Sequence, residues 1–210
     1  MRRIVLLTLA LFAIAVGIGL LLGRSAESPA QSPRSERVAT AVFAGGCFWC
    51  TESDFDHMLG VLSTISGYSG GRVANPTYEQ VSTGNTGHIE AVRITYDPRQ
   101  IDYARLVENF FRTIDPLDSG GSFCDRGYQY RSAIFVATPE ERRIAEAAKA
   151  QVERQLGAPI ATLILPRRAF YRAEEYHQDY YRKNPLRYRF YRWNCGRDQR
   201  LGQVWGRSGH

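Results

Sequence analysis

The stretch Gly45-Gly46-Cys47-Phe48-Trp49-Cys50 (residues 45–50) determines the fold expected around it and singles out one sulfur atom. The apolar run 39–44 is typical of a strand, and the two glycines allow a sharp turn at its end. Residues 48–59 carry apolar side chains at helical spacing, so we expect a helix directly after Cys47. Unpaired N–H groups at a helix N-terminus favour the thiolate, which is the reactive form of cysteine. The sequence therefore predicts a nucleophilic Cys47 with a lowered pKa.

The cysteines as a group point to redox chemistry. An inert buried cysteine is the ordinary alternative for Cys47, because free cysteine is among the most buried residue types. The two glycines directly before Cys47 and a second cysteine three residues after it, Cys50, favour reactivity instead. A structural zinc ribbon needs two Cys-x-x-Cys pairs, and the sequence has one, so no metal is expected.

The rest of the chain shows patterns of both helix and strand. A helix over 139–156 is predicted by a capping Thr138, a proline at its first position and an acidic first turn. The other predicted elements are helices at 102–114 and 174–183 and strands at 61–68, 88–96, 131–137 and 160–165. This order predicts an α+β fold, a two-layer sandwich of a mixed β-sheet and packed helices. Polar segments at 70–85 and 115–129 are expected loops, and loops of that length are usually functional.

The N-terminus predicts a membrane anchor. Two arginines precede an uncharged, largely apolar run, residues 4–22, which exceeds a secretory apolar region of about 7–15 residues and suits a bilayer span of about 17–25. We therefore expect a signal anchor at 1–24, a flexible linker at 25–38 and a folded domain at 39–210 on the periplasmic or extracytoplasmic side.

Composition is ordinary for a globular domain, and the charge is uneven. The chain has 210 residues, 44% hydrophobic and 23% charged, and a net charge of +6. Residues 182–200 form a basic C-terminal tail that interleaves arginines with aromatic side chains. Such a mixture can imitate a nucleic-acid patch, but the predicted export segment argues against that partner. A solvated basic surface that touches anionic lipid fits better.

Glu90 is the candidate proton donor. In the strand 88–96 it shares a face with the apolar Val92 and Ile94, so it is expected to point inward. Burial disfavours the charged form of a carboxyl group and raises its pKa, which would let Glu90 carry a proton at neutral pH. A glutamate at a strand end that faces water is an equally common alternative.

Several polar residues are weaker candidates. Asp125 and Tyr130 lie in the polar stretch 120–132, and Tyr78 follows Asn75-Pro76-Thr77; each can fix a polar ligand atom. Such residues are also frequent in ordinary turns. His177, among tyrosines of the predicted helix 174–183, is expected to be structural.

Together these segments resemble the peptide methionine-sulfoxide reductase A family over residues 41–185, with the anchor and the basic tail outside the resemblance. The resemblance is carried by blocks that occur in order: Gly46-Cys47-Phe48-Trp49-Cys50, Gly67-Tyr68-Ser69-Gly70-Gly71, Asn75-Pro76-Thr77-Tyr78, Gly84-Asn85-Thr86-Gly87-His88-Ile89-Glu90-Ala91-Val92, Gln129-Tyr130-Arg131-Ser132-Ala133-Ile134 and Tyr176-His177-Gln178.

The resemblance implies reduction of methionine sulfoxide, free or in proteins, with preference for the S epimer and no cofactor. Cys47 would attack the substrate sulfur, become a sulfenic acid and release methionine. Glu90 would give a proton to the sulfoxide oxygen. Phe48 and Trp49 would form an apolar cage for the methyl group. The oxygen would be oriented by Tyr78, Asp125 and Tyr130.

Recycling of the sulfenic acid needs a second thiol, and three are candidates. The resemblance favours Cys195, because family members commonly keep a recycling cysteine in the C-terminal tail. Cys50, which replaces a glycine often found there, is closer in sequence, and Cys124 would pair with Cys195 instead. A thioredoxin-like protein is the expected final reductant.

Two rival functions remain. The Cys47-x-x-Cys50 pair is also typical of a thioredoxin-like protein disulfide oxidoreductase. A noncatalytic, membrane-tethered binding module that uses the basic tail is the second rival.

Overall fold

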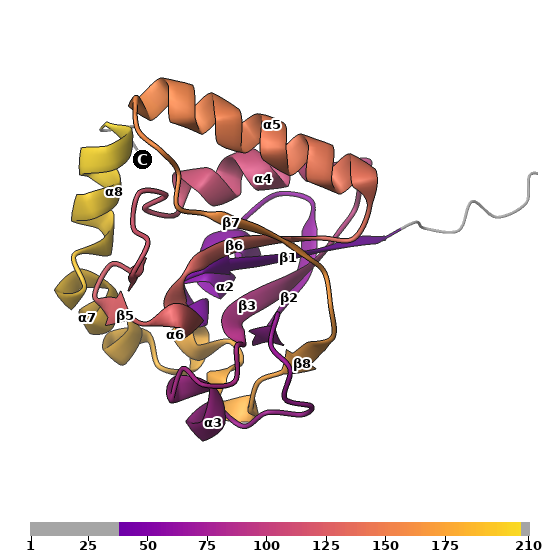
Figure 1. Cartoon of the computed structure of the whole chain (residues 1–210). Helices are drawn as coiled ribbons and strands as arrows, with labels where there is room; N and C mark the ends of the chain where they lie inside the picture. The colour runs from indigo at the N-terminus through magenta and orange to yellow at the C-terminus, as the bar shows by residue number, and fades with distance from the viewer. Residues whose placement is uncertain (1–37, 207–210) are drawn as a thin grey trace, which may run out of the picture. The chain divides into compact units, whose positions relative to one another are not determined.

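A computed structural model describes residues 38–206. The predicted signal anchor at 1–24 and all but the last residue of the predicted linker lie outside these residues. Across 38–206, none of the helices has both the length and the apolar character that a bilayer crossing demands. The described chain alternates strands and helices and ends in helices that return to the body of the domain (Figure 1).

A mixed sheet of six strands forms the centre of the domain. Its strand order is β7-β6-β1-β3-β2-β8, and its neighbours are antiparallel except for the parallel pair β6 and β7. This confirms the predicted α+β class with a mixed sheet. The strands are β1 (Ala39–Gly45), β2 (Val61–Ser69), β3 (Ile89–Tyr96), β6 (Ser132–Val136), β7 (Leu163–Pro166) and β8 (Phe170–Arg172), and a separate hairpin joins β4 (Gly121–Ser122) to β5 (Asp125–Arg126).

The helices agree with the sequence best where local signals are strong. α5 has the predicted bounds: the Thr138 side chain accepts the Glu141 N–H at 3.1 Å, and the helix ends at Gly157, whose φ is 64°. The helix after Cys47 ends earlier than predicted, and the predicted helix 174–183 is two short turns. The helices are α2 (Phe48–Asp56), α3 (Tyr78–Ser82), α4 (Tyr103–Arg112), α5 (Pro139–Leu156), α6 (Tyr180–Lys183), α7 (Pro185–Asn194) and α8 (Arg197–Trp205), with 3₁₀ turns at Tyr128–Tyr130 and Glu175–His177.

The main core lies between one face of the sheet and helices α2, α4 and α5. Phe43 of β1 packs between Phe55 of α2 and Phe110 of α4, with ring centroids 5.4 and 5.1 Å away. Burial of such aromatic side chains supplies most of the free energy that fixes α2 against the sheet. The opposite face carries a smaller cluster, which consists of Val42, Ala44, Ile89, Ala91, Ala133 and Phe135.

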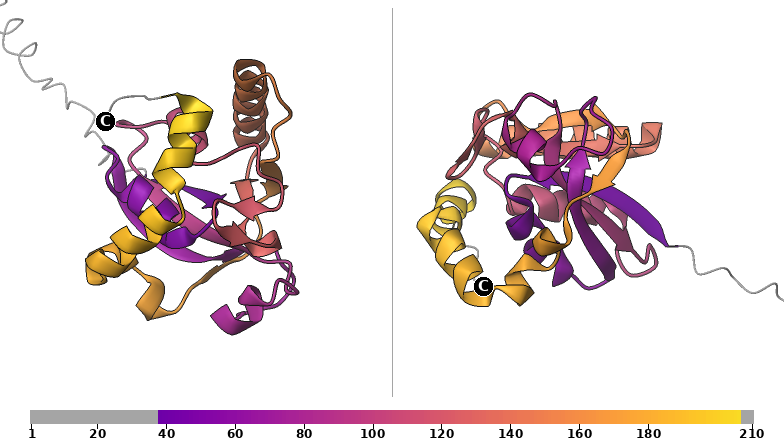
Figure 2. Two further views of the ribbon diagram at one scale, coloured as in Figure 1. Left: turned by 90° about the vertical axis from the view of Figure 1, so that its left-hand side faces the viewer. Right: turned by 90° about the horizontal axis from the view of Figure 1, so that it is seen from below.

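The C-terminal segment, which the sequence analysis left as a basic tail, folds as α7 and α8 against the domain (Figure 2). Arg197, at the start of α8, is 2% exposed and donates to the carbonyl oxygens of Gly45 and Thr113. The Trp205 indole N–H donates to the carbonyl of Ile114 at 3.0 Å. The Arg197 bonds bring the start of α8 to the turn between β1 and α2, and the Trp205 bond fixes the end of α8 to the segment after α4.

Candidate active site

The turn that carries Cys47 requires both of its glycines. Gly46 has φ of +88°, a conformation that side chains disfavour, and a Cβ there would lie 2.5 Å from the Cβ of Ser122. A Cβ on Gly45 would lie 2.8 Å from the Thr51 hydroxyl. The close approach brings Cys47 to the N-cap position of α2, at the end of the central strand β1.

Cys47 is buried, and its pKa differs from the prediction. The side chain is 7% exposed and contacts the thiol of Cys50 and the hydroxyl of Tyr191. Burial raises the pKa of Cys47 well above its usual range, and Cys50 and Glu90 raise it further. The predicted lowered pKa is therefore wrong for this structure. Burial is the main reason, and the N–H of Phe48, the first of α2, donates to Glu90 at 3.0 Å.

Cys50 carries the lowered pKa of the pair. A hydrogen bond from the Cys47 thiol lowers the pKa of Cys50, whereas burial raises it. The positive charges of Arg197 and Arg192 also lower the pKa of Cys50. Of the two sulfurs, Cys50 is therefore the one that gives up its proton more readily.

Glu90 has the environment that the strand pattern predicted. It lies on β3, 3% exposed, and its carboxylate oxygen accepts the Phe48 N–H. Burial raises the pKa of Glu90 to about 8, the Phe48 N–H opposes this shift, and the charge of Asp125 adds to it. At neutral pH Glu90 therefore holds a proton, and it contacts the N–H of the residue that follows Cys47.

The three weaker polar candidates lie around Glu90. The hydroxyls of Tyr78 and Tyr130 hydrogen-bond to each other, and the charge of Glu90 acts on both. Asp125 is half-buried; burial raises its pKa, and a hydrogen bond from the Tyr191 hydroxyl opposes the shift. The fold thus brings together residues that are far apart in the sequence and whose individual signals were weak.

Aromatic rings enclose the same place. The Trp49 ring stacks on Tyr180 with centroids 3.7 Å apart, and its indole N–H donates to His177 at 3.0 Å. The Phe48 ring is buried and lies 4.8 Å from the His177 ring. Burial lowers the pKa of His177, so the ring is a neutral acceptor that orients Trp49. This agrees with the structural role expected for His177.

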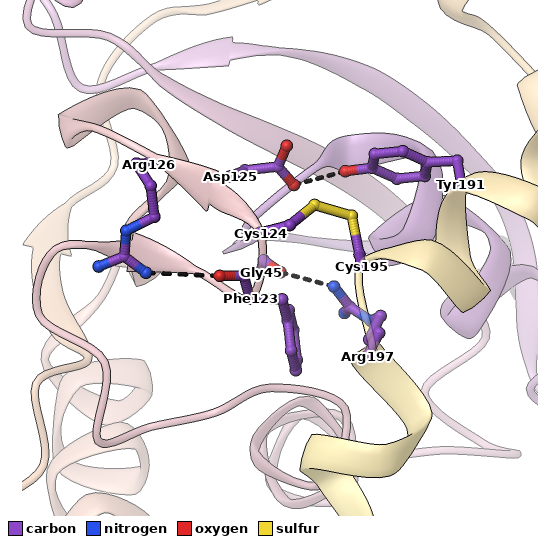
Figure 3. Close-up of a disulfide and its surroundings, with 8 residues drawn as sticks. All are labelled: Gly45, Phe123, Cys124, Asp125, Arg126, Tyr191, Cys195 and Arg197. Atoms are coloured by element: carbon purple, nitrogen blue, oxygen red, sulfur yellow. Dashed lines mark hydrogen bonds between the residues drawn. A yellow bond between two sulfur atoms is a disulfide. The ribbon is translucent and has the colours of Figure 1, made fainter.

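The other two cysteines form a disulfide. Cys124 of the β4–β5 hairpin is bonded to Cys195, which follows α7, with Cα atoms 4.9 Å apart (Figure 3). Cys195 is therefore not a free thiol beside Cys47, as its predicted recycling role suggested; the alternative pairing with Cys124 is the one observed. Among residues 38–206, one group has the character of metal ligands, Cys124, Asp125 and Cys195, and its sulfurs are both committed to this bond.

Comparison with known proteins identifies this constellation. The family model described as peptide methionine sulfoxide reductase matches residues 39–208. The chain belongs to the peptide methionine sulfoxide reductase family. The match includes the basic tail, which the sequence analysis placed outside the resemblance.

Individual relatives span nearly the whole reductase. Peptide methionine sulfoxide reductase MsrA 2 of Caulobacter vibrioides is 50% identical over 98% of this chain and 100% of that protein. MsrA of Bacillus licheniformis is 50% identical over 83% of this chain and 97% of its own.

Solved structures agree with the fold. Reduced Mxr1 from Saccharomyces cerevisiae is similar at a TM-score of 0.68 and 33% identity, over 71% of this chain and 87% of its own. Methionine sulfoxide reductase A of Corynebacterium diphtheriae gives a TM-score of 0.64 and 36% identity, over 71% of this chain and 76% of that chain. The protein is thus a thiol-dependent peptide methionine sulfoxide reductase, and a thioredoxin-like disulfide oxidoreductase is not favoured.

The residues that sequence analysis missed come from the C-terminal segment. Tyr180, Tyr191 and Arg197 all contact the site or the turn that carries it. The signal was present, since aromatic and basic residues alternate over 182–200, but that pattern was interpreted as a solvated surface.

Proposed function

We propose that Cys47 reduces methionine sulfoxide with Glu90 as the proton donor. Cys47 attacks the substrate sulfur, Glu90 protonates the sulfoxide oxygen, and methionine leaves while Cys47 retains the oxygen as a sulfenic acid. The observation that carries this assignment is the raised pKa of Glu90, about 8, on a side chain bonded to the N–H that follows Cys47. Tyr78, Tyr130 and Asp125 would orient the oxygen, and Phe48 and Trp49 would hold the methyl group.

The proton of Cys47 needs an acceptor, because burial keeps this thiol protonated. Cys50 accepts the hydrogen bond of Cys47 and has the lowered pKa. Cys50 is therefore placed to take the proton as the sulfur attacks, after which it is itself a thiol.

The direct test measures methionine formed from a methionine-sulfoxide peptide by the purified protein with dithiothreitol. Wild type should turn over, and Cys47→Ser should form no methionine above background. An insulin-disulfide assay, run in parallel, addresses the rival function. Disulfide turnover without methionine formation would contradict the proposed chemistry.

Cys50 is also the thiol that we propose closes the first disulfide. It contacts Cys47 directly, whereas Cys195 is bonded to Cys124. Attack of the Cys50 thiol on the sulfenic acid forms the Cys47–Cys50 bond and releases water. After one turnover of fully reduced protein, mass mapping should find Cys47 linked to Cys50. A link from Cys47 to Cys195 would restore the role that the sequence analysis preferred.

A thioredoxin-like protein is the reductant we propose, with the Cys124–Cys195 disulfide as its point of attack. Cys124 is exposed, whereas Cys47 and Cys50 are buried. Dithiol exchange needs an accessible sulfur, so the outer bond suits a protein reductant. Trapping with a thioredoxin that lacks its second active-site cysteine should capture Cys124 or Cys195. Capture at Cys47 or Cys50 would contradict this proposal.

For location, we propose a membrane-anchored, periplasmic or extracytoplasmic domain, on the ground of the apolar run at residues 4–22. The protein should sediment with membranes and resist extraction by alkaline carbonate, and externally added protease should degrade the domain in spheroplasts. Recovery in the soluble fraction would contradict this proposal.

A further inference from the structure

Tyr191 of α7 lies against the sulfur atom at the centre of the reaction. Its hydroxyl contacts the Cys47 thiol and donates a hydrogen bond to Asp125. Its ring meets the Trp49 ring edge-on, with centroids 5.6 Å apart. One side chain therefore touches the nucleophile, an oxygen-orienting carboxylate and the wall of the methyl cage.

The position of Tyr191 conflicts with access of a substrate. Cys47 is 7% exposed, so its sulfur is nearly enclosed. Reaction requires the substrate sulfur to reach about 3–3.5 Å from the attacking atom. The Tyr191 hydroxyl is already in contact with that sulfur, between it and Asp125. The side chain must therefore move before a methionine sulfoxide can occupy the site.

The disulfide holds Tyr191 in this place. Cys195 lies one helical turn after Tyr191, and its N–H donates to the Tyr191 carbonyl at 2.9 Å. Its partner Cys124 is adjacent to Asp125 in the sequence, the residue that Tyr191 bonds. Figure 3 shows the disulfide beside the Asp125–Tyr191 hydrogen bond, so a covalent and a polar link join the same two segments.

Other contacts keep the tail near the domain without the disulfide. Arg192 pairs with Asp54 at 2.8 Å, and Arg197 bonds Gly45, Asp54 and Thr113. Opening the disulfide would therefore loosen the hold on the Tyr191 side chain rather than release the whole tail. Such a local opening costs far less free energy than unfolding.

We propose that Tyr191 is a redox-controlled cap on Cys47: it covers the sulfur while the Cys124–Cys195 disulfide is closed, and methionine sulfoxide enters after a dithiol has opened that bond. The inference rests on the proposed role of Cys47 as the nucleophile. A dithiol delivers two electrons and two protons to the disulfide, which becomes two thiols, and the reductant leaves as its own disulfide.

The cap also fixes the order of events in a cycle. When the Cys47–Cys50 disulfide is exchanged onto the reduced tail thiols, Cys47 and Cys50 become thiols again and the Cys124–Cys195 disulfide forms. These are the oxidation states found in the structure. The cap is then closed until the next reductant arrives, so each substrate must follow a reductant.

The test measures the reaction of Cys47 with iodoacetamide by peptide mass mapping, in a Cys50→Ser background that leaves Cys47 as the free thiol of the closed state. With the disulfide closed, labelling should be slow. Opening by dithiothreitol, followed by its removal, should accelerate labelling by about tenfold or more, as expected when a local closed state is released. The Cys124→Ala, Cys195→Ala variant should label at the fast rate without reductant.

Two variants on α7 separate the cap from a general loosening of the tail. Tyr191→Ala should label rapidly with the disulfide still closed. Phe190→Ala, on the same helix but 64% exposed, should retain the slow closed rate and the fast open rate. Equal labelling of wild type in both states, or slow labelling of Tyr191→Ala, would overturn the cap.

A second measurement distinguishes failure of the cap from failure of the proposed function. In single turnovers of wild type, which keeps Cys50 as the proton acceptor, the open state should form methionine about tenfold faster than the closed state, in parallel with labelling. Disulfide-dependent labelling with no methionine from either state would refute the nucleophile and leave the cap standing. Methionine formed at equal rates in both states would refute the cap.

Discussion

The protein has two pairs of cysteines, and their surroundings are opposite. Cys47 and Cys50 are free thiols buried at the end of the central strand, beside a protonated Glu90. Cys124 and Cys195 form a disulfide at the outside of the domain, where Cys124 is exposed. A buried site strengthens the electrostatic effects that proton transfer needs, whereas exchange with another protein needs an accessible sulfur. With the roles proposed above, the difference would let one small domain separate the reduction of substrate from its own recycling.

The reaction at the buried pair, Cys47 and Cys50, depends most on Glu90. Removing the Glu90 proton should give the largest effect on the rate. Glu90→Gln keeps an oxygen that can accept the Phe48 N–H but has no acidic proton, so the rate of a single turnover should fall by about 10²–10⁴. In wild type the rate should also decline above pH 8, where Glu90 ionises. A rate unchanged by the substitution would transfer the donor role to another group, with Tyr130 the first to examine.

The same substitution should affect stability with a defined sign. The folded state holds the Glu90 proton up to about pH 8, whereas an unfolded chain releases it near 4.5, so wild-type stability should fall as pH rises between those values. Relative to Glu90→Gln, the free energy of unfolding of wild type should drop by up to about 5 kcal/mol across this window. Urea titrations of both proteins at several pH values measure it. Parallel stability curves would show that Glu90 titrates normally.

The next largest effect should come from removing Arg197, which links the C-terminal helices to the turn that carries Cys47. Arg197 is buried and bonds Gly45, Asp54 and Thr113, so Arg197→Met removes a buried cation and should lower the free energy of unfolding by about 3–5 kcal/mol. The matched control is Arg187→Met on the exposed face of α7, expected to change stability by less than about 0.5 kcal/mol. Similar values for both would mean that the tail is held by other contacts.

Removal of the Cys124–Cys195 disulfide should give the smallest of these effects on stability. Cys124 and Cys195 are 71 residues apart, and replacing both by alanine should cost about 2–4 kcal/mol of unfolding free energy. Wild type reduced with dithiothreitol should show a loss of the same size. A loss larger than that of Arg197→Met would reverse the ranking and make the disulfide the main fastener of the tail.

Local and periodic signals were sufficient to predict much of the inner region. The bounds of α5 followed from its capping threonine, its proline and its acidic first turn, all of which act within a few residues. The inward direction of Glu90 followed from the two-residue period of β3, and burial then raised its pKa as predicted. The lowered pKa predicted for Cys47 was wrong, because the sequence shows neither how deeply the fold buries this thiol nor that Glu90 accepts the Phe48 N–H.

The outer region could not be predicted in the same way. Helix α7 has apolar side chains on both faces: Tyr188 and Tyr191 point to the domain, while Leu186, Phe190 and Trp193 are exposed. No clean amphipathic stripe results, and the segment was interpreted as a basic tail with a solvated surface. The bond between Cys124 and Cys195 depends on a fold that brings together residues far apart in the sequence, and their spacing alone left three candidates for recycling.

The stacking of Trp49 on Tyr180, with its indole N–H bonded to His177, also makes the domain a reporter of its own state. Indole fluorescence responds to nearby rings, hydrogen bonds and water, and the edge of this ring is covered by Tyr191. Any displacement of that tyrosine exposes Trp49 to solvent and alters the colour and intensity of its emission. The proposed movement of Tyr191 can therefore be followed optically, as a change in the Trp49 part of the emission, in real time and without an added dye.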